Sequence, residues 1–334
     1  MALLIVAIAA LMIFLATIDC NPSLFVWDAI LTFSDLSQTG PAPLRPFKGR
    51  TFWVTGASSG IGEEYAARVC ELGGDVVVSG RREANLLKLK ARCSGGGAGN
   101  GRVHVLPFDL LGSSEEGLRV VTAEALKAYG KGIDVLVLNA GRSQRSKSLD
   151  TPIEATKELM ELNFVQPALL ATVVMKADDW KGKQKGHIVL TSSVAGKLPV
   201  ALSTSYSASK AAASAYFGGL RSENNFLRVD VVCPGPVATG IALAAHAEAG
   251  ADLGNEAAEG KMPAARCANL MISAARGPWF LMYEVWISEQ PVLLFTALSQ
   301  YCPTCVALLS KVVGPKRVEA FEAGLDVYKM SSWK

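Results

Sequence analysis

Short apolar runs rich in β-branched residues alternate along this chain with segments whose apolar residues recur at helical spacing. The runs occupy residues 51–55, 75–79, 103–107, 133–138, 186–191 and 228–232. Strands that alternate with helices in this way form parallel sheets covered by helices. The pattern therefore predicts an α/β fold, a doubly wound parallel sheet, and we expect it to form one domain over residues 47–276.

The two ends of the chain are more apolar than this middle part. Residues 1–18 carry no charged side chain and, as a helix, reach across most of a hydrocarbon layer about 30 Å thick. A cleavable signal peptide is the alternative, but no Lys or Arg precedes the apolar run and the residues before Asp19 resemble a cleavage site poorly. We predict an uncleaved membrane anchor at residues 1–18, followed by a juxtamembrane segment and a proline-containing linker over residues 19–46.

A second apolar stretch covers residues 279–313, where acidic residues and prolines argue against a spanning helix. We expect the C-terminal extension, residues 277–334, to contribute a pocket wall, a membrane-interface element or a dimer contact. The glycine-rich residues 94–101 are expected to form a surface connection.

Composition narrows the class of function. The net charge of the 334 residues is +3 and 19% of them are charged, so there is no basic field of the kind that binds nucleic acid. The three histidines lack ligand-type neighbours, so we expect no metal site. The seven cysteines are scattered and odd in number, so no disulfide framework is expected, and Cys302 and Cys305 are interpreted as incidental packing.

A glycine-rich turn, Thr55-Gly56-Ala57-Ser58-Ser59-Gly60-Ile61-Gly62, directly follows the first predicted strand. Glycines allow a tight strand-to-helix turn and close backbone approach, so that a pyrophosphate can rest on the amides at the helix N-terminus. Such a turn is a weak signal by itself. Two further segments that follow predicted strands give it weight, Asn139-Ala140-Gly141 and Pro234-Gly235-Pro236-Val237-Ala238-Thr239.

Tyr206 and Lys210 are four residues apart and therefore share a helix face, with Ser193 thirteen residues before the tyrosine. An ammonium group beside a phenol is expected to lower the phenol's pKa from about 10, which suits Tyr206 to acid–base chemistry at neutral pH. A serine hydroxyl alongside can hold the oxygen of a carbonyl or alcohol while hydride is exchanged at carbon. The spacing thus predicts a redox centre that works with a bound dinucleotide.

The motifs TGASSGIG, NAG, a serine, YSASK and PGPVAT occur in the order and spacing of the short-chain dehydrogenase/reductase family, which the chain resembles over residues 48–275. The resemblance implies a Rossmann-type fold and gives four residues catalytic roles. Ser193 would hold the substrate oxygen, Tyr206 would be the general acid and base, and Lys210 would activate the phenol and bind the nicotinamide ribose. Asn163 would kink a helix and hold a water in a proton relay to Lys210.

The resemblance also implies a nicotinamide cofactor. The second predicted strand ends at Ser79 without the carboxylate typical of NAD-selective members, and Arg81 follows, which can pair with a ribose 2′-phosphate. We therefore predict NADP (NADPH), although the glycine turn has serines where many NADP-selective relatives carry a basic residue. The expected cofactor contacts are Gly56, Ser58, Ser59, Gly60, Ile61, Gly62, Arg81, Asp109, Leu110, Asn139, Ala140, Gly141, Tyr206, Lys210, Pro236, Val237 and Thr239.

Two segments that cofactor chemistry does not explain, RSQRS at residues 142–146 and EVWISEQP at residues 284–291, narrow the resemblance to membrane-bound relatives of the hydroxysteroid dehydrogenases. That resemblance implies a lid at residues 237–262, a location in the endoplasmic reticulum membrane, and a small apolar carbonyl or alcohol substrate of steroid or retinoid class. A homodimer is a further expectation. The alternatives are a membrane-bound long-chain 3-ketoacyl reductase, which needs the same four residues, and a catalytically idle membrane scaffold.

Overall fold

The computed structural model describes residues 47–94, 101–240, 246–247, 261–276, 283–325 and 327. The predicted anchor (1–18), the juxtamembrane segment and linker (19–46) and most of the glycine-rich connection (94–101) lie outside the described residues. So do most of the predicted lid (237–262) and residues 279–282 of the second apolar stretch.

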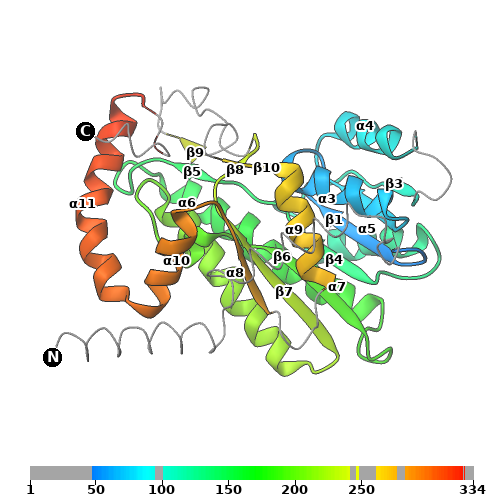
Figure 1. Ribbon diagram of the computed structural model, residues 1–334. Coiled ribbons are helices and arrows are strands. Elements are labelled where there is room, and N and C mark those ends of the chain that lie inside the picture. The colour runs from blue at the N-terminus through cyan, green and yellow to red at the C-terminus, as the bar shows by residue number, and fades with distance from the viewer. Residues whose placement is uncertain are drawn as a thin grey trace, which may run out of the picture.

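Seven parallel strands form the central sheet, in the order β3–β2–β1–β4–β6–β7–β11 (Figure 1). Their bounds are β1 Thr51–Thr55, β2 Asp75–Ser79, β3 Val103–Val105, β4 Val135–Leu138, β6 Gly186–Thr191, β7 Leu227–Pro234 and β11 Glu284–Ile287. The predicted doubly wound parallel sheet is confirmed. Its strand order reverses between β1 and β4, so a ligand crevice is expected beside the carboxyl ends of these two strands.

The sheet ends in a strand that the apolar pattern did not reveal. β11 pairs with β7, with Glu284 opposite Val231 and Ile287 opposite Pro234. Part of the unexplained segment 284–291 is therefore an edge strand, and the sheet extends past the boundary expected after residue 276. A four-residue strand within a long apolar stretch has no distinct period, so only its pairing with β7 defines it.

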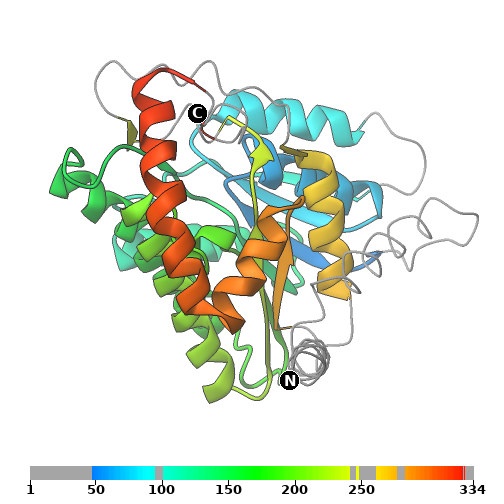
Figure 2. The same cartoon turned by 60° about the vertical axis from the view of Figure 1, so that its left-hand side comes forward.

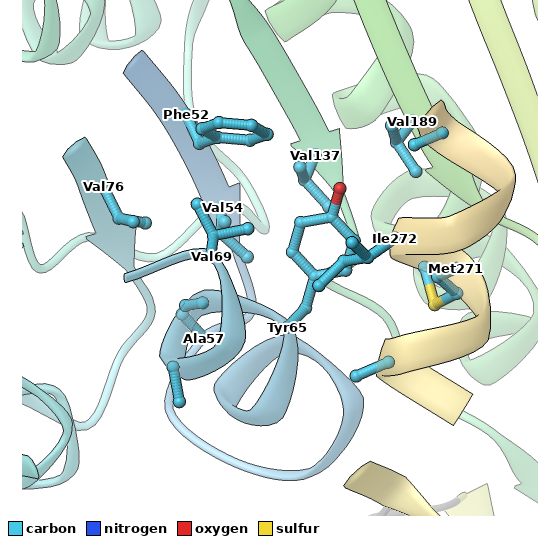
Figure 3. Close-up of a cluster of buried hydrophobic side chains, with 14 of the residues drawn as sticks. Phe52, Val54, Ala57, Tyr65, Val69, Val76, Val137, Val189, Met271 and Ile272 are labelled. Carbon is cyan, nitrogen blue, oxygen red and sulfur yellow. The ribbon is translucent and has the colours of Figure 1, made fainter. Parts of the chain in front are cut away.

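Helices cover both faces of the sheet. Three helices pack on one face: α3 (Gly60–Glu71), α4 (Glu83–Ser94) and α9 (Ala264–Arg276). The other face carries α5 (Glu115–Lys127), α7 (Gln166–Ala177) and α8 (Thr204–Glu223). Phe52 and Val54 of β1 belong to the first core and Trp53 to the second, the alternation required of a strand that is buried on both faces. In Figure 3, Tyr65 of α3 lies among these β1 side chains and the α9 residues Met271 and Ile272.

The other helices of the described residues flank this three-layer core. α6 (Ile153–Met160) runs through the π-helical turn η2 (Glu161–Val165) into α7, and α10 (Val292–Tyr301) and α11 (Pro303–Glu322) form a V-shaped pair (Figure 2). Leu293 and Ala297 attach α10 to the second core. Short elements complete the described chain: β5 Gln144–Arg145, η3 Val194–Gly196, β8 Val237–Ala238, β9 His246–Ala247 and β10 Met262–Pro263.

The interpretation of Cys302 and Cys305 as incidental packing was wrong. A disulfide joins the two residues at the junction of α10 and α11, with their Cα atoms 5.5 Å apart, and Cys305 is exposed. The other cysteines of the described residues, Cys70, Cys93, Cys233 and Cys267, are buried thiols.

Among the described residues, one helical stretch has the length and apolar composition of a membrane span, Ile153–Ala177. Its most apolar window is 56% buried within the domain. It supplies Leu159, Leu170 and Val174 to the core, so the domain's own packing accounts for its composition.

Candidate active site

A cleft of about 340 Å³ opens at the carboxyl ends of β1, β2, β4, β6 and β7. Of the predicted site residues, the following line it: Gly56, Ser58, Ser59, Gly60, Ile61, Arg81, Asp109, Leu110, Asn139, Ala140, Gly141, Ser193, Tyr206, Lys210, Val237 and Thr239. Gly62, Asn163 and Pro236 are not part of the lining. The topology thus gathers residues from distant parts of the chain at the predicted edge of the sheet.

The glycine-rich turn packs directly against the loop that follows β4. Gly56 has a φ of +67°, and a Cβ at this position would lie 2.8 Å from the Cα of Ala140. Only glycine satisfies both the conformation and the contact. Thr55 ties the same loops together, because its Oγ1 accepts hydrogen bonds from the amides of Asn139 (3.1 Å) and Ala140 (3.2 Å). A cradle that a single Cβ would fill is suited to a pyrophosphate, which needs close backbone approach.

Gly62 supports this turn from behind. A Cβ on Gly62 would lie 2.5 Å from the carbonyl oxygen of Gly56 and 2.4 Å from Nδ2 of Asn139. Gly62 therefore permits the packing of α3 on the turn and does not line the cleft.

Three of the predicted catalytic residues meet in the cleft. Ser193 follows β6, and its Oγ accepts from the amide of Ala195 (3.1 Å) and donates to the carbonyl of Pro234 (3.3 Å). Tyr206 and Lys210 lie in the first turns of α8, with Nζ of Lys210 5.9 Å from the centre of the Tyr206 ring. The same ammonium group donates to the main-chain carbonyl of Thr191 at 2.8 Å. The expected juxtaposition of hydroxyl, phenol and ammonium is present.

The expected direction of the Tyr206 pKa was wrong. Burial raises the pKa of this phenol above 10.0, and the opposing influences are a hydrogen bond with Ser193 and then the charge of Arg145. Burial also lowers the pKa of Lys210 to about 8, because the ammonium form is poorly solvated there. Desolvation therefore outweighs the influences of Ser193 and Arg145 that favour the phenolate, and the helix spacing alone did not indicate this burial.

Asn163 lies in the π-helical turn η2, so the predicted irregularity of this helix is present. Its side chain is buried, where Oδ1 accepts from the amide of Arg142 (2.9 Å) and Nδ2 donates to the carbonyl of Arg142 (3.0 Å) and to Oγ of Ser209 (3.0 Å). A Cβ on Gly141 would lie 2.9 Å from Oδ1 of Asn163 and 3.4 Å from Nζ of Lys210. Gly141 therefore separates the amide from the ammonium group.

The end of the cleft beside β2 is basic. Arg81 lies 3.9 Å from the carboxylate of Asp109, and both side chains are about half exposed. Arg82 donates to Oγ of Ser58 (3.3 Å) and of Ser59 (2.7 Å), so its guanidinium lies over the glycine-rich turn. The serines that depart from the usual NADP pattern thus contact a cation supplied by another loop.

The sequence reasoning missed several residues of the site. Arg82 could have been found, since it adjoins Arg81 and follows the same strand. Thr55 was quoted as part of the motif, but no local signal indicates that its hydroxyl binds the β4 loop. The side-chain oxygen of Gln144 accepts from the amides of Ser205 (2.9 Å) and Tyr206 (3.2 Å). These residues are far from Gln144 in the sequence, so no local pattern predicts the contact.

Comparison with known proteins agrees with this geometry. A family profile described as short chain dehydrogenase matches residues 50–249. Dehydrogenase/reductase SDR family member 7 of Homo sapiens is 37% identical over 305 residues, which cover 90% of this chain and 88% of the human protein. Hydroxysteroid 11-beta-dehydrogenase 1-like protein of Xenopus tropicalis is 35% identical over 246 residues, covering 72% of this chain and 80% of that protein. These matches confirm the resemblance inferred from the motifs.

Two solved structures show the same fold. A short-chain dehydrogenase from Streptomyces avermitilis has a TM-score of 0.63 and 26% identity, covering 78% of this chain and 95% of its own. A short-chain dehydrogenase from Sphingobium yanoikuyae in complex with NADPH has a TM-score of 0.61 and 26% identity, covering 77% of this chain and 95% of its own.

Proposed function

This chain belongs to the short-chain dehydrogenase family, and from that premise we propose that it is an NADP(H)-dependent oxidoreductase that interconverts carbonyl and hydroxyl groups on apolar substrates such as steroids or retinoids. The observation that carries the proposal is the meeting of Ser193, Tyr206 and Lys210 in a cleft whose other end is the glycine cradle. A redox centre and a dinucleotide cradle in one cleft fit hydride transfer.

The chain's own residues would handle the oxygen and its proton. Ser193 holds the carbonyl oxygen by hydrogen bonding, and Tyr206 donates a proton to it during reduction or removes the proton during oxidation. Hydride is exchanged with the nicotinamide cofactor. Lys210 helps to orient that cofactor's ribose, and Asn163 fixes the main chain of Arg142 beside the site.

NADP selectivity is supported by the basic end of the cleft. Arg81 and Arg82 both line the cleft where the ribose bound at the end of β2 would lie, and no acidic residue ends that strand. Guanidinium groups suit a 2′-phosphate because they donate paired hydrogen bonds.

An apolar substrate and membrane attachment are supported by two features. One relative is named as hydroxysteroid 11-beta-dehydrogenase 1-like, which is consistent with a steroid or a similar lipid as substrate. The V-shaped pair α10 and α11 exposes large apolar side chains, namely Leu294, Leu298, Tyr301, Leu308, Leu309 and Val312. We propose that these lie at a membrane surface, with the predicted anchor at residues 1–18 holding the chain in the endoplasmic reticulum membrane.

The test is turnover by the purified full-length protein in detergent, followed by NADPH absorbance with steroids, retinoids and long-chain 3-ketoacyl thioesters. We expect reduction of a steroid or retinoid carbonyl and weaker activity with NADH. Turnover of 3-ketoacyl thioesters alone would favour the lipid reductase. NADPH binding without any turnover would favour the scaffold.

The role of Tyr206 is tested with Tyr206→Phe, which removes one hydroxyl and keeps the ring. We expect turnover to fall by about a hundredfold or more, the contribution typical of general acid–base catalysis, with NADPH affinity largely kept. Lys210→Ala should lower both turnover and NADPH affinity. Retention of more than a few per cent of the parent rate by Tyr206→Phe would contradict the role proposed for Tyr206.

A further inference from the structure

Residues 144–146, part of a segment that cofactor chemistry does not explain, lie against the N-terminus of the helix that carries Tyr206. Gln144, Arg145 and Ser146 are each at most 5% exposed. The amide of Ser146 donates to the carbonyl of Leu202 (3.3 Å), a bulky residue held at a φ of +67° directly before Ser203, the N-cap residue of α8. A left-handed conformation at a leucine persists only where its surroundings hold it, as is common at functional sites.

Gln144 acts as the N-cap of α8 although it is remote in sequence. Its Oε1 accepts from the amides of Ser205 (2.9 Å) and Tyr206 (3.2 Å), the second and third residues of the helix. These are the donors that an N-cap side chain normally satisfies, and Ser203 at the N-cap position makes no such bond. The Gln144 Nε2 group donates to Oγ of Ser146 (3.2 Å) and to Oγ1 of Thr151 (2.9 Å), which fixes the orientation of the amide.

Arg145 brings a buried cation to the same helix end. Its Nη1 donates to the carbonyl of Gln144 (2.7 Å) and to Oγ of Ser203 (3.2 Å), three residues before Tyr206. A cation at a helix N-terminus is unfavourable with the helix dipole, and burial of its charge is unfavourable as well. The guanidinium nevertheless links β5 to the N-cap residue of α8, at the helix end that carries Tyr206.

The charge of Arg145 acts on the Tyr206 phenol. The ionisable groups whose charges act on it come from two elements, Arg145 of β5 and Cys233 of β7. Nζ of Lys210, on α8 itself, lies 5.9 Å from the centre of the ring. Ser193, after β6, contributes a hydrogen bond. Arg145 favours the phenolate, whereas the Lys210 ammonium is directed to the carbonyl of Thr191 at 2.8 Å.

We propose that Gln144 and Arg145 are positioning residues for Tyr206: Gln144 fixes the first turn of α8, and Arg145 supplies a positive charge that stabilises the phenolate. This inference rests on the proposed acid–base role of Tyr206. It also explains part of the RSQRS segment, because Gln144 and Arg145 would hold and polarise the Tyr206 side chain without lining the cleft.

The charge is tested by titrating the phenol directly. Difluorotyrosine is incorporated at position 206 of the full-length protein, and its ionisation is followed by fluorine NMR without substrate. Arg145→Met should move the titration midpoint to higher pH, and Arg145→Lys should restore it toward the parent value. Ser203→Ala, which removes a hydroxyl that holds the guanidinium, should shift the midpoint in the same direction by less.

Lys147→Met is the matched control for charge, since Lys147 directly follows the RSQRS segment and pairs at the surface with Asp150 (3.2 Å) and Glu322 (2.9 Å). Its midpoint should stay at the parent value. An unmoved midpoint in Arg145→Met, or an equal shift in Lys147→Met, would overturn the role of Arg145. If Arg145→Met does not fold, an unmoved midpoint in Ser203→Ala overturns it instead.

The cap is tested by hydrogen exchange at the Ser205 and Tyr206 amides. Gln144→Leu should accelerate their exchange and lower kcat by about tenfold, a smaller loss than removal of the acid–base group itself causes, while NADPH affinity stays constant. Gln144→Glu keeps the acceptor oxygens and should restore amide protection. Unchanged exchange in Gln144→Leu, or a loss confined to NADPH affinity, would overturn the cap. Neither the exchange nor the fluorine readout requires turnover, so a failed substrate screen would leave both results interpretable.

Discussion

The side chain of Lys210 is buried, and burial of its positive charge destabilises the folded domain. Burial lowers its pKa from 10.5 to about 8. Below pH 8 the lysine is charged in both folded and unfolded states, so the full desolvation penalty applies. Between pH 8 and 10.5 the unfolded state holds the proton more tightly, so the contribution of this group to stability rises with pH.

Lys210→Met should therefore stabilise the domain at pH 7 by about 1 to 3 kcal/mol, after the loss of one hydrogen bond to Thr191 is allowed for. The gain should shrink as the pH rises above 8. Urea unfolding at several pH values measures both effects, with the exposed Lys88→Met as control. A destabilised Lys210→Met protein at pH 7, or a gain independent of pH, would contradict the burial penalty.

Arg81 and Arg82 differ in what they contact, but both line the end of the cleft where we expect the 2′-phosphate. Arg82 contacts Ser58 and Ser59 of the glycine turn, whereas Arg81 lies beside Asp109. Replacement of either arginine by alanine should weaken NADPH binding by about 1.5 to 3 kcal/mol, the value of a charge-assisted hydrogen bond, and leave NADH nearly unaffected.

The comparison uses dissociation constants of both cofactors for Arg81→Ala, Arg82→Ala and the double variant. Equal losses for NADPH and NADH would show that the arginines support the loop and do not select the 2′-phosphate. A loss of NADPH affinity in Arg82→Ala alone would show that Arg82 selects the 2′-phosphate and that Arg81, the residue predicted from the sequence, does not.

At the scale of elements, the sequence predicted what local pattern determines. The buried strands β1, β2 and β6 have the predicted bounds, because apolar runs bounded by turn residues specify them. Pairing and tertiary contact determine the rest. β11 is a strand because of β7, and the N-terminus of α8 is capped by a glutamine from another strand. The Tyr206 pKa was mispredicted for the same reason, since burial is a property of the folded chain.

The turn between β1 and α3 gives a prediction at this scale. Gly56→Ala should abolish NADPH binding and destabilise the domain, because the new methyl group would lie 2.8 Å from the Ala140 backbone at a φ of +67°. Gly112→Ala is the matched control, with a φ of +72° and nothing within 4 Å of its Cβ. It should cost only about 1 kcal/mol for the conformation and leave NADPH binding intact. NADPH fluorescence and thermal unfolding of both variants make the comparison, and equal binding losses would contradict the proposed cradle.

At the scale of the whole molecule, the described domain begins at Phe47 and ends at Val327. It contains the sheet, both cores and the cleft. A chain that begins near Pro41 should therefore fold and bind NADPH as the full-length protein does. This separates catalysis from location, since the predicted anchor at residues 1–18 precedes everything that builds the site.

The last prediction concerns how the molecule is attached to a membrane. Residues 1–18 are free of charged side chains, so their insertion should resist high-salt and alkaline washes that remove electrostatically bound proteins. The chain that begins near Pro41 should be extracted by those washes, although the apolar side chains exposed on α10 and α11, including Leu308 and Val312, should leave weak association that detergent removes. The measurements are fractionation of both chains and the N-terminal sequence of the mature protein. A mature chain that begins after residue 18, or a shortened chain that resists alkaline extraction as well as the full-length one, would contradict the anchor. Either result would move the proposed attachment to α10 and α11, because these helices expose several large apolar side chains.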